Sequence, residues 1–128
     1  MDTKLEWLHP RRILYAVRSG TESLTALTTF AEEVIHHLEE GQPPLHLIWH
    51  MSNLDVTGVD QRQAMTILNR IMKHPHLHWF VVVDPGMSPL RRFLASALLR
   101  LSGIHWRTVD SVADGQAFLQ RVDKSLNQ

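Results

Sequence analysis

Short apolar segments alternate with longer amphipathic segments along the chain, and this alternation limits the possible fold more than any other feature of the sequence. The apolar runs are rich in β-branched and aromatic residues and are bounded by turn-forming residues, which is typical of strands. Five runs predict strands: Leu5 to Leu8, Ile13 to Val17, Leu45 to Met51, His78 to Val83 and Ile104 to Val109. The first two runs are close enough together to predict an antiparallel hairpin.

Four amphipathic segments have the spacing of one apolar helix face. The first covers Thr21 to Glu40 and has Gly41 placed to end it, and the second ends before Pro75. The third covers Ser88 to Ser102, with Ser88 as N-cap and Pro89 at the first helical position. The fourth starts at Ser111. Its expected buried face consists of Ala117, Phe118 and Val122, and that of the second helix of Ala64, Ile67, Leu68, Ile71 and Met72.

The resulting order, β-β-α-β-α-β-α-β-α, predicts an α/β fold. Strands that alternate with helices of this length pair in parallel through right-handed crossovers. We therefore expect residues 1–128 to form one domain, with a mixed, mainly parallel five-stranded sheet covered by four helices. Ligands of such sheets bind in the loops beyond the carboxyl ends of the parallel strands, so we expect candidate sites there.

Composition excludes several classes of function. The 128 residues include 13 basic and 13 acidic side chains and no cysteine, so thiol chemistry and disulfides are excluded and the chain lacks the overall positive charge of most nucleic-acid binders. The longest apolar run, Phe93 to Leu99, is far shorter than the ~20 residues that span a bilayer. We expect a cytoplasmic protein with no integral membrane association, no bound nucleic acid and no cofactor.

The loop after the third predicted strand contains the richest group of polar residues at the expected functional edge: Ser52, Asp55, Thr57 and Asp60. Thr57 or Ser52 could accept a phosphoryl group near a helix N-terminus, where backbone N–H groups and the helix dipole favour an anion. The alternative is that Asp55, Thr57 and Asp60 are turn and capping residues, which is what these residue types do in many loops.

A second candidate site lies at the start of the third predicted helix. Ser88, Arg91 and Arg92 could bind an anion at the helix N-terminus, such as the head group of a lipid, with an apolar pocket beneath the helix. The segment has no glycine-rich nucleotide-binding pattern. The alternative is an ordinary helix packed on the sheet with its arginines in solvent.

No catalytic or metal-binding pattern stands out. His74, His76 and His78 could place three imidazoles on one side of an extended segment, but no carboxylate or cysteine lies beside them, so we predict no metal site. No Ser-His-Asp order, paired carboxylates or Gly-x-Ser-x-Gly motif is present. The sequence therefore predicts a protein that is not an enzyme, with histidine acid/base chemistry as the remaining catalytic alternative.

The pieces LEWLHPRRILYAVRSG, LHLIWHMSNLDVTGVD, HPHLHWFVVVDP and VDSVADGQAFL, in this order, resemble the STAS domain, the fold of the bacterial sporulation anti-anti-sigma factor. The similarity covers nearly the whole chain. It implies a β/α superhelix that binds a protein partner or a small ligand without catalysis. In regulatory members a serine that follows an Asp-Leu-Ser-Gly-like segment is phosphorylated by a partner kinase.

This chain differs from the family pattern at the phosphorylation motif. His50 stands where the first aspartate would be, and the acceptor position falls near Gly58 and Val59, which have no hydroxyl. Thr57 and Asp60 are the nearest polar residues. The resemblance thus implies a regulatory interaction module. Such a module would either use Thr57 as a substitute phospho-acceptor or act without the phosphorylation step.

The four tryptophans, Trp7, Trp49, Trp79 and Trp106, together with five methionines, suggest association. Aromatic and methionine side chains are enriched at protein interfaces, so we expect a homodimer, with tryptophans that pack inside the monomer as the alternative. Our leading hypothesis is a STAS-like module that binds an unknown protein partner through the loop from Asp55 to Asp60 and the adjoining helix. The alternative is a domain that binds a small anionic or lipid ligand at residues 84–92.

Overall fold

The computed structural model describes residues 2–50, 54–55, 57–83 and 105–127, and these form one twisted sheet with helices on both faces. The strands are β1 (Asp2–His9), β2 (Ile13–Thr21), β3 (Leu45–His50), β4 (Leu54–Asp55), β5 (Leu77–Val83) and β6 (His105–Val109). The helices are α1 (Leu24–Glu40), α2 (Gln61–Met72), α4 (Val112–Val122) and the 3₁₀ helix η1 (Lys124–Asn127).

The sheet has the order β1-β2-β3-β5-β6, with the short strand β4 paired to the end of β2. β1 is antiparallel to β2, whereas the pairs β2–β3, β3–β5 and β5–β6 are parallel. The predicted α/β class and mixed, mainly parallel sheet are confirmed. The two-residue strand β4 was not predicted, because a segment so short has no period to read.

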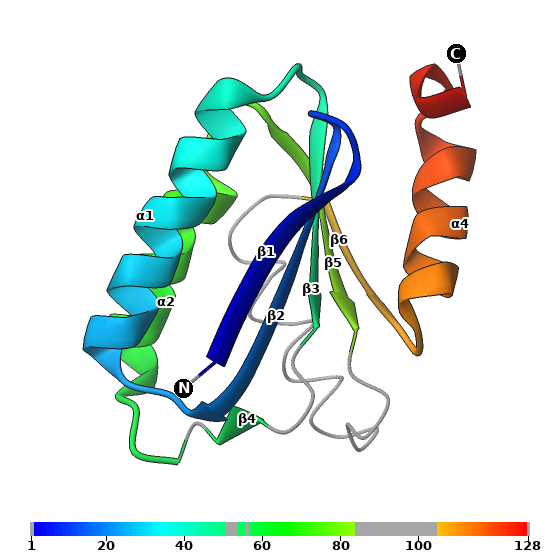
Figure 1. Cartoon of the computed structure of the whole chain (residues 1–128). Coiled ribbons are helices and arrows are strands. Elements are labelled where there is room, and N and C mark those ends of the chain that lie inside the picture. Colours follow the sequence, from blue (N-terminus) through cyan, green and yellow to red (C-terminus); the bar gives the residue numbers. More distant parts are fainter. Residues whose placement is uncertain (1, 51–53, 56, 84–104, 128) are drawn as a thin grey trace.

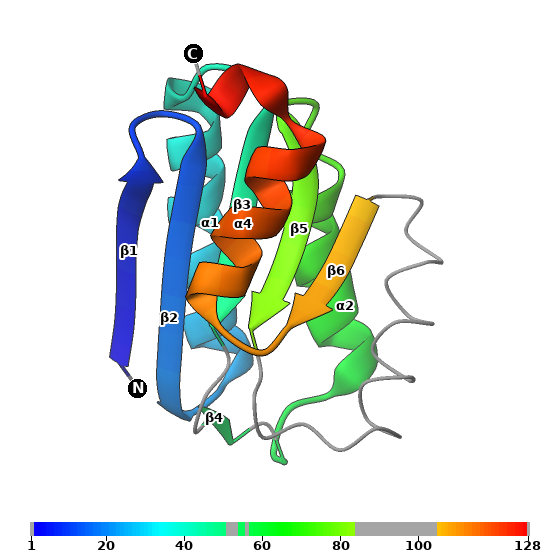
Figure 2. The ribbon, with the colours of Figure 1, turned by 90° about the vertical axis from the view of Figure 1, so that its right-hand side faces the viewer.

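Two apolar layers hold the fold together, one on each face of the sheet. Figures 1 and 2 show α1 and α2 on one face and α4 on the other. Leu47 and Trp49 of β3 point toward α1 and α2, while Ile48 between them points toward Phe118 of α4. Because side chains alternate along a strand, the short strand β3 contributes residues to both apolar layers.

The β1–β2 hairpin turns at a four-residue segment that starts at His9. The N–H of Arg12 donates to the carbonyl of His9 over 2.9 Å, and Arg11 has a positive φ of 59°. Pro10 and Arg11 thus occupy the two central positions of the turn. The predicted hairpin is confirmed, but both strands extend beyond the apolar runs, since backbone pairing also includes polar residues.

The helix α1 begins later than its apolar pattern indicates. Thr21 still belongs to β2, and Ser23 is the N-cap, its hydroxyl accepting a hydrogen bond from the N–H of Ala26. Gly41 ends the helix as predicted. A Cβ at Gly41 would lie 2.7 Å from a methyl carbon of Leu45, so the chain can pass close to β3 only because this residue has no side chain.

The expected buried face of α4 is wrong at two of its three positions. Phe118 is buried, but Ala117 is exposed and Val122 keeps 42% of its surface exposed. Gly115 and Leu119 are the other buried residues of this helix. Ala117 lies on the side of the helix opposite to Leu119, and Val122 is the last residue of the helix, beyond which Leu126 of η1 closes the core.

The four tryptophans pack within the monomer. Trp49 is buried in the core beneath α1, and Trp7, Trp79 and Trp106 are partly buried against the two cores. Packing therefore accounts for these residues, and the homodimer stays a prediction. Among the helices of the described residues, none is long and apolar enough to cross a membrane. The predicted helix Ser88 to Ser102 lies outside the described residues.

Candidate functional site

The loop between β4 and α2 lies at the edge of the sheet where the parallel strands end (Figure 1). We define the β4–α2 loop as Asp55 and residues 57–60. β4 places it beside the end of β2, because Leu54 pairs with Gly20 and Asp55 with Thr21. The carbonyl of Asp55 also accepts a 2.8 Å hydrogen bond from the N–H of Glu22. The predicted loop after β3 is therefore held beside the end of β2.

Asp55 closes a tight turn with Thr57. Its Oδ1 accepts hydrogen bonds from the backbone N–H of Thr57 at 3.0 Å and from the Thr57 hydroxyl at 2.8 Å. The bond from the N–H, followed by that from the hydroxyl, lowers the pKa of the Asp55 carboxyl below its ordinary value of 3.8. Both residues are exposed, so the loop presents a carboxylate and a neighbouring hydroxyl to solvent.

Asp60 holds the other end of the loop as the N-cap of α2. Its Oδ1 accepts hydrogen bonds from the N–H groups of Arg62 at 2.9 Å and Gln63 at 3.1 Å. These contacts satisfy two of the donors that a helix start leaves without partners. The hydrogen bonds of Asp55 and Asp60 are the ones that the turn-and-cap interpretation predicts, and the roles of these residues in binding stay predictions.

A buried ion pair supports the loop from inside the sheet. Arg18, 1% exposed, donates from Nε to Glu22 over 2.9 Å and from Nη1 to the hydroxyl of Thr3 over 3.1 Å, and its guanidinium lies 4.3 Å from the centre of the Phe30 ring. Glu22 in turn accepts from the N–H of Ser23, the N-cap of α1. The pair therefore fixes the segment to which β4 is attached.

Sequence reasoning missed this ion pair. The predicted strand stops at Val17, and Arg18 was given no role. The available signal was the alternation Leu14, Ala16, Arg18, which places a charge on the inward face of β2, with a carboxylate four residues later. A charge at such a position is stable only when it is paired.

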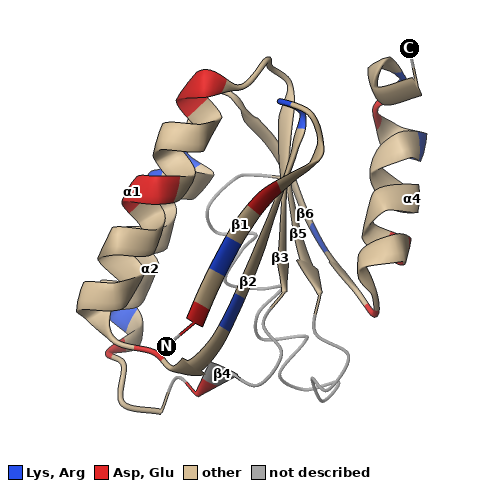
Figure 3. Ribbon diagram, in the orientation of Figure 1, with Lys and Arg blue, Asp and Glu red and all other residues tan. Residues whose placement is uncertain are grey.

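The outer surface of α2 carries three exposed cations: Arg62, Arg70 and Lys73, which we call the basic stripe. At 100° per residue these positions fall within one sector of the helix and its C-cap. None of the three forms an ion pair with a described residue. Figure 3 shows blue segments on α2 and red segments on the neighbouring α1, so the two helices of this face differ in charge.

A second polar cluster lies at the opposite end of the parallel strands, and we call it the Asp123 cluster: Arg12, His46, Asp123 and Ser125. The Asp123 carboxylate accepts from Arg12 at 2.8 Å, from His46 Nε2 at 2.7 Å and from the Ser125 N–H at 3.0 Å. His46 is completely buried and Asp123 is 9% exposed. The cluster joins the β1–β2 turn, the start of β3 and the chain after α4, so we assign it a structural role.

The Asp123 cluster keeps its carboxylate charged and its imidazole neutral. Burial acts to raise the pKa of Asp123, but the hydrogen bonds from Ser125 and His46 outweigh it and lower that pKa to about 2. Burial lowers the pKa of His46 below its ordinary value of 6.5. Because a carboxylate only accepts, Nε2 carries the proton, and Nδ1 has no partner among the described residues. Protonating Nδ1 would bury an unpaired donor.

The three clustered histidines are divided between two places. His74 Nδ1 accepts from the N–H of His76 at 3.1 Å, and the two rings lie 5.0 Å apart. His78 instead packs against His46 and His105, with ring centres at 5.8 and 4.9 Å. Within the described residues no group of three or more histidine, aspartate or glutamate side chains could hold a metal ion. The row of imidazoles that an extended segment could give does not form, because His74 and His76 lie in the turn before β5 whereas His78 lies in that strand.

Four other predicted site residues, Ser52, Ser88, Arg91 and Arg92, lie outside the described residues. Of the predicted loop residues, the structure brings Asp55 and Thr57 into contact and places Asp60 at the other end of the loop, as the N-cap of α2.

Comparisons with known proteins find that this chain is similar in structure to solved proteins. No protein-family model matches the chain, and no curated protein matches it. It is similar to the anti-sigma factor antagonist SpoIIAA in its unphosphorylated form, with a TM-score of 0.53 and 13% identity over 94% of this chain and 96% of that one. It is also similar to the Bacillus cell fate determinant SpoIIAA in its phosphorylated form, with a TM-score of 0.52 and 13% identity over 95% and 100% of the two chains. The predicted resemblance to the STAS domain is therefore confirmed for the fold, and this chain has the fold of SpoIIAA.

Proposed function

We propose that this protein is a non-catalytic regulatory module of STAS type, which binds a protein partner through the β4–α2 loop and the outer surface of α2. The observation that carries the proposal is the way the loop is built. Its two ends are fixed by hydrogen bonds of Asp55 and Asp60, while a Cβ added at Gly58 would meet no atom within 4 Å. A loop held at both ends loses less conformational entropy when a partner binds than a loop without such hydrogen bonds.

The basic stripe indicates the chemistry of the partner. Arg62 is exposed next to the loop, Arg70 and Lys73 are exposed toward the other end of α2, and none of the three has an ion-pair partner among the described residues. A surface of one charge favours association with a surface of the other charge and raises the association rate at low salt. The proposed partner therefore presents an acidic surface to α2.

The structural neighbours support the regulatory part of the proposal. Both are SpoIIAA, one described as an anti-sigma factor antagonist and the other as a cell fate determinant in its phosphorylated form. By analogy, the partner of this chain is a regulator of the anti-sigma type, and the chain acts by contact. Because proteins of one fold can have different functions, the proposed contact surface rests on the β4–α2 loop and the basic stripe of this chain.

Thr57 is our candidate acceptor if a partner kinase modifies this loop. Its hydroxyl now donates to Asp55 at 2.8 Å. A phosphoryl group would replace that donor by two negative charges next to a carboxylate, which would open the turn by repulsion. Phosphorylation at Thr57 would therefore change the shape of the proposed contact surface. Intact-mass and peptide measurements on protein from its own host test this directly.

The proposed surface can be tested by adding bulk at Gly58. The Gly58→Tyr variant places a large side chain at the open tip, where a Cβ meets no atom within 4 Å. The matched control is Ala113→Tyr, at an exposed position of α4 on the other face of the sheet. Each protein would be expressed with a tag in its own host, cross-linked, captured and compared by quantitative mass spectrometry.

We expect a partner that is enriched with the wild type and with Ala113→Tyr but lost with Gly58→Tyr. Its cross-links should reach Lys73 at the end of α2 more often than Lys124 in η1. Equal enrichment in all three proteins, or cross-links through Lys124 alone, would contradict the proposal.

The alternative function, a small-ligand site at residues 84–92, lies outside the described residues and stays a prediction.

A further inference from the structure

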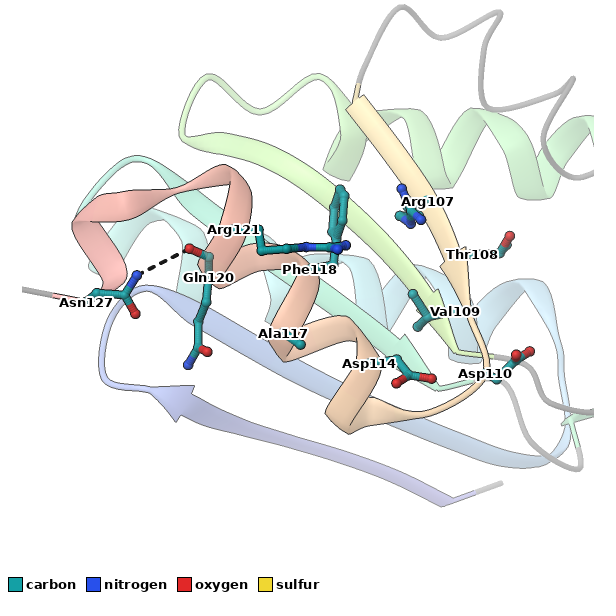
Figure 4. A pocket seen from close by; sticks show the side chains of 10 residues that line it. All are labelled: Arg107, Thr108, Val109, Asp110, Asp114, Ala117, Phe118, Gln120, Arg121 and Asn127. Carbon is teal, nitrogen blue, oxygen red and sulfur yellow. Dashed lines mark hydrogen bonds between the residues drawn. The ribbon is translucent and has the colours of Figure 1, made fainter.

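A pocket of about 540 Å³ lies between β6 and α4, on the face of the sheet opposite to α1 and α2 (Figure 4). It is within the size range of small-molecule sites. Its lining is more polar than apolar, and it includes two arginines at one end and two aspartates near the start of α4. No sequence pattern indicated this pocket, because its two walls come from separate elements that meet only in the fold.

The two arginines of the pocket converge on one aromatic ring. The guanidinium of Arg107, from β6, lies 4.6 Å from the centre of the Phe118 ring, and that of Arg121, from α4, lies 5.8 Å from it. Figure 4 shows Arg121 extending along α4 toward Phe118, with the tip of Arg107 close by. Phe118 is only 5% exposed and is held from below by Trp79, at 4.8 Å between ring centres.

Neither guanidinium has an anionic partner among the described residues, since no ion pair includes Arg107 or Arg121. Two like charges that share one ring repel each other, and an anion between them would remove that repulsion. Guanidinium groups bind carboxylate and phosphate through paired, charge-assisted hydrogen bonds. Both side chains already lie against the ring, so less conformational freedom is lost when the anion binds than for two free arginines.

We propose that this pocket binds a small organic anion, whose phosphate or carboxylate group is held by Arg107 and Arg121. The volume of the pocket exceeds that of a bare phosphate ion, so the ligand has a body that extends along α4. Asp114 and Gln120 line this part. Their oxygen atoms accept hydrogen bonds, which suits a body with hydroxyl or amino groups.

The pocket is separate from the proposed protein-binding surface. Arg107 belongs to β6 and Arg121 to α4, whereas the β4–α2 loop and the basic stripe lie at the strand ends and on the other face. Failure of one proposal therefore leaves the other unchanged.

The test is isothermal titration calorimetry of the full chain with ribose 5-phosphate, citrate, inorganic phosphate and uncharged ribose. The wild type would be compared with Arg107→Ala/Arg121→Ala and with the control Lys4→Ala/Lys124→Ala, which removes the same charge outside the pocket and outside the basic stripe. All four side chains are exposed, so both variants should fold, and circular dichroism checks this. Chemical shifts of Phe118 and Arg121 locate the bound probe.

We expect an organic anion to bind the wild type and the control alike, and to bind Arg107→Ala/Arg121→Ala roughly tenfold or more weakly. Tighter binding of ribose 5-phosphate than of citrate would identify phosphate as the anion, and the reverse would identify carboxylate. Uncharged ribose should not bind. The proposal is overturned if no anion binds, if both double variants lose binding equally, or if inorganic phosphate binds as tightly as the organic anions.

Discussion

The two ends of the parallel strands are held by hydrogen bonds of different kinds. In the β4–α2 loop, the side chains of Asp55 and Asp60 bond to groups two or three residues away, and all of them are exposed. In the Asp123 cluster, one buried carboxylate bonds to Arg12 and His46, which lie 111 and 77 residues away in the sequence.

This difference separates a surface that can bind from a cluster that stabilises. Exposed local bonds contribute little to global stability, so the loop can change or engage a partner while the fold persists. The Asp123 cluster joins three distant segments in a place with little water, so its loss leaves charged and polar groups buried without partners. We therefore expect mutations at the two ends to separate binding from stability.

The largest expected effect is that of Asp123→Ala. Removing the carboxylate leaves the Arg12 guanidinium and the His46 N–H without their partner in a nearly buried site, which should lower the free energy of unfolding by about 3 kcal/mol. Urea denaturation followed by tryptophan fluorescence measures this. The control is Asp114→Ala, an exposed aspartate of α4, which should change stability far less. Similar effects of the two variants would remove the proposed distinction between the two ends.

Acid should destabilise the protein through His46, the next largest effect. His46 faces Asp123, Arg12 and His78, and its pKa in the folded state lies below its ordinary value of 6.5. The unfolded state therefore takes up a proton first, so the free energy of unfolding falls as the pH drops below about 6.5. One proton limits this slope to about 1.4 kcal/mol per pH unit. Asp123, with its pKa lowered to about 2, adds a further loss below its ordinary value of 3.8.

His46→Gln isolates this contribution. Glutamine can still donate a hydrogen bond to Asp123 but does not titrate, so denaturation curves between pH 7.5 and 5 should show a weaker pH dependence than in the wild type. The other histidines remain in both proteins and cancel in the comparison. An equal slope in the two proteins would show that His46 is not the buried group that acid protonates.

The smallest expected effect is that of Asp60→Ala at the loop. Loss of the N-cap leaves two N–H groups of α2 to solvent and should lower the free energy of unfolding by about 1 kcal/mol. Asp60→Asn keeps the cap and serves as the control in the same denaturation measurement. A loss as large as that of Asp123→Ala would mean that the loop is part of the stabilising framework and would count against the separation of binding from stability between the two ends.

Much of the fold could be predicted because the relevant signals are local. The apolar runs of β3 and β5, the periodic face of α1, and the ends of helices at Gly41 and Ser111 depend on neighbours in the sequence. Of the candidate site, Asp55 and Asp60 could be found as polar loop residues, and their hydrogen bonds are also local. The buried face of α4 was harder to predict. Val122 fits the apolar period of the helix, but it is exposed because the chain turns into η1 directly after it.

The sequence by itself determined the alternation of strands and helices, the two-faced sheet and the polar loop at its edge, because hydrophobic period and turn chemistry act over a few residues. Only the tertiary structure decided which distant groups meet: Asp123 with Arg12 and His46, and Arg107 with Arg121 around Phe118. The physical reason is that a buried charge or a pocket depends on the pairing of segments far apart in the chain, and the stability of such contacts comes from excluding water, which no single segment can do alone.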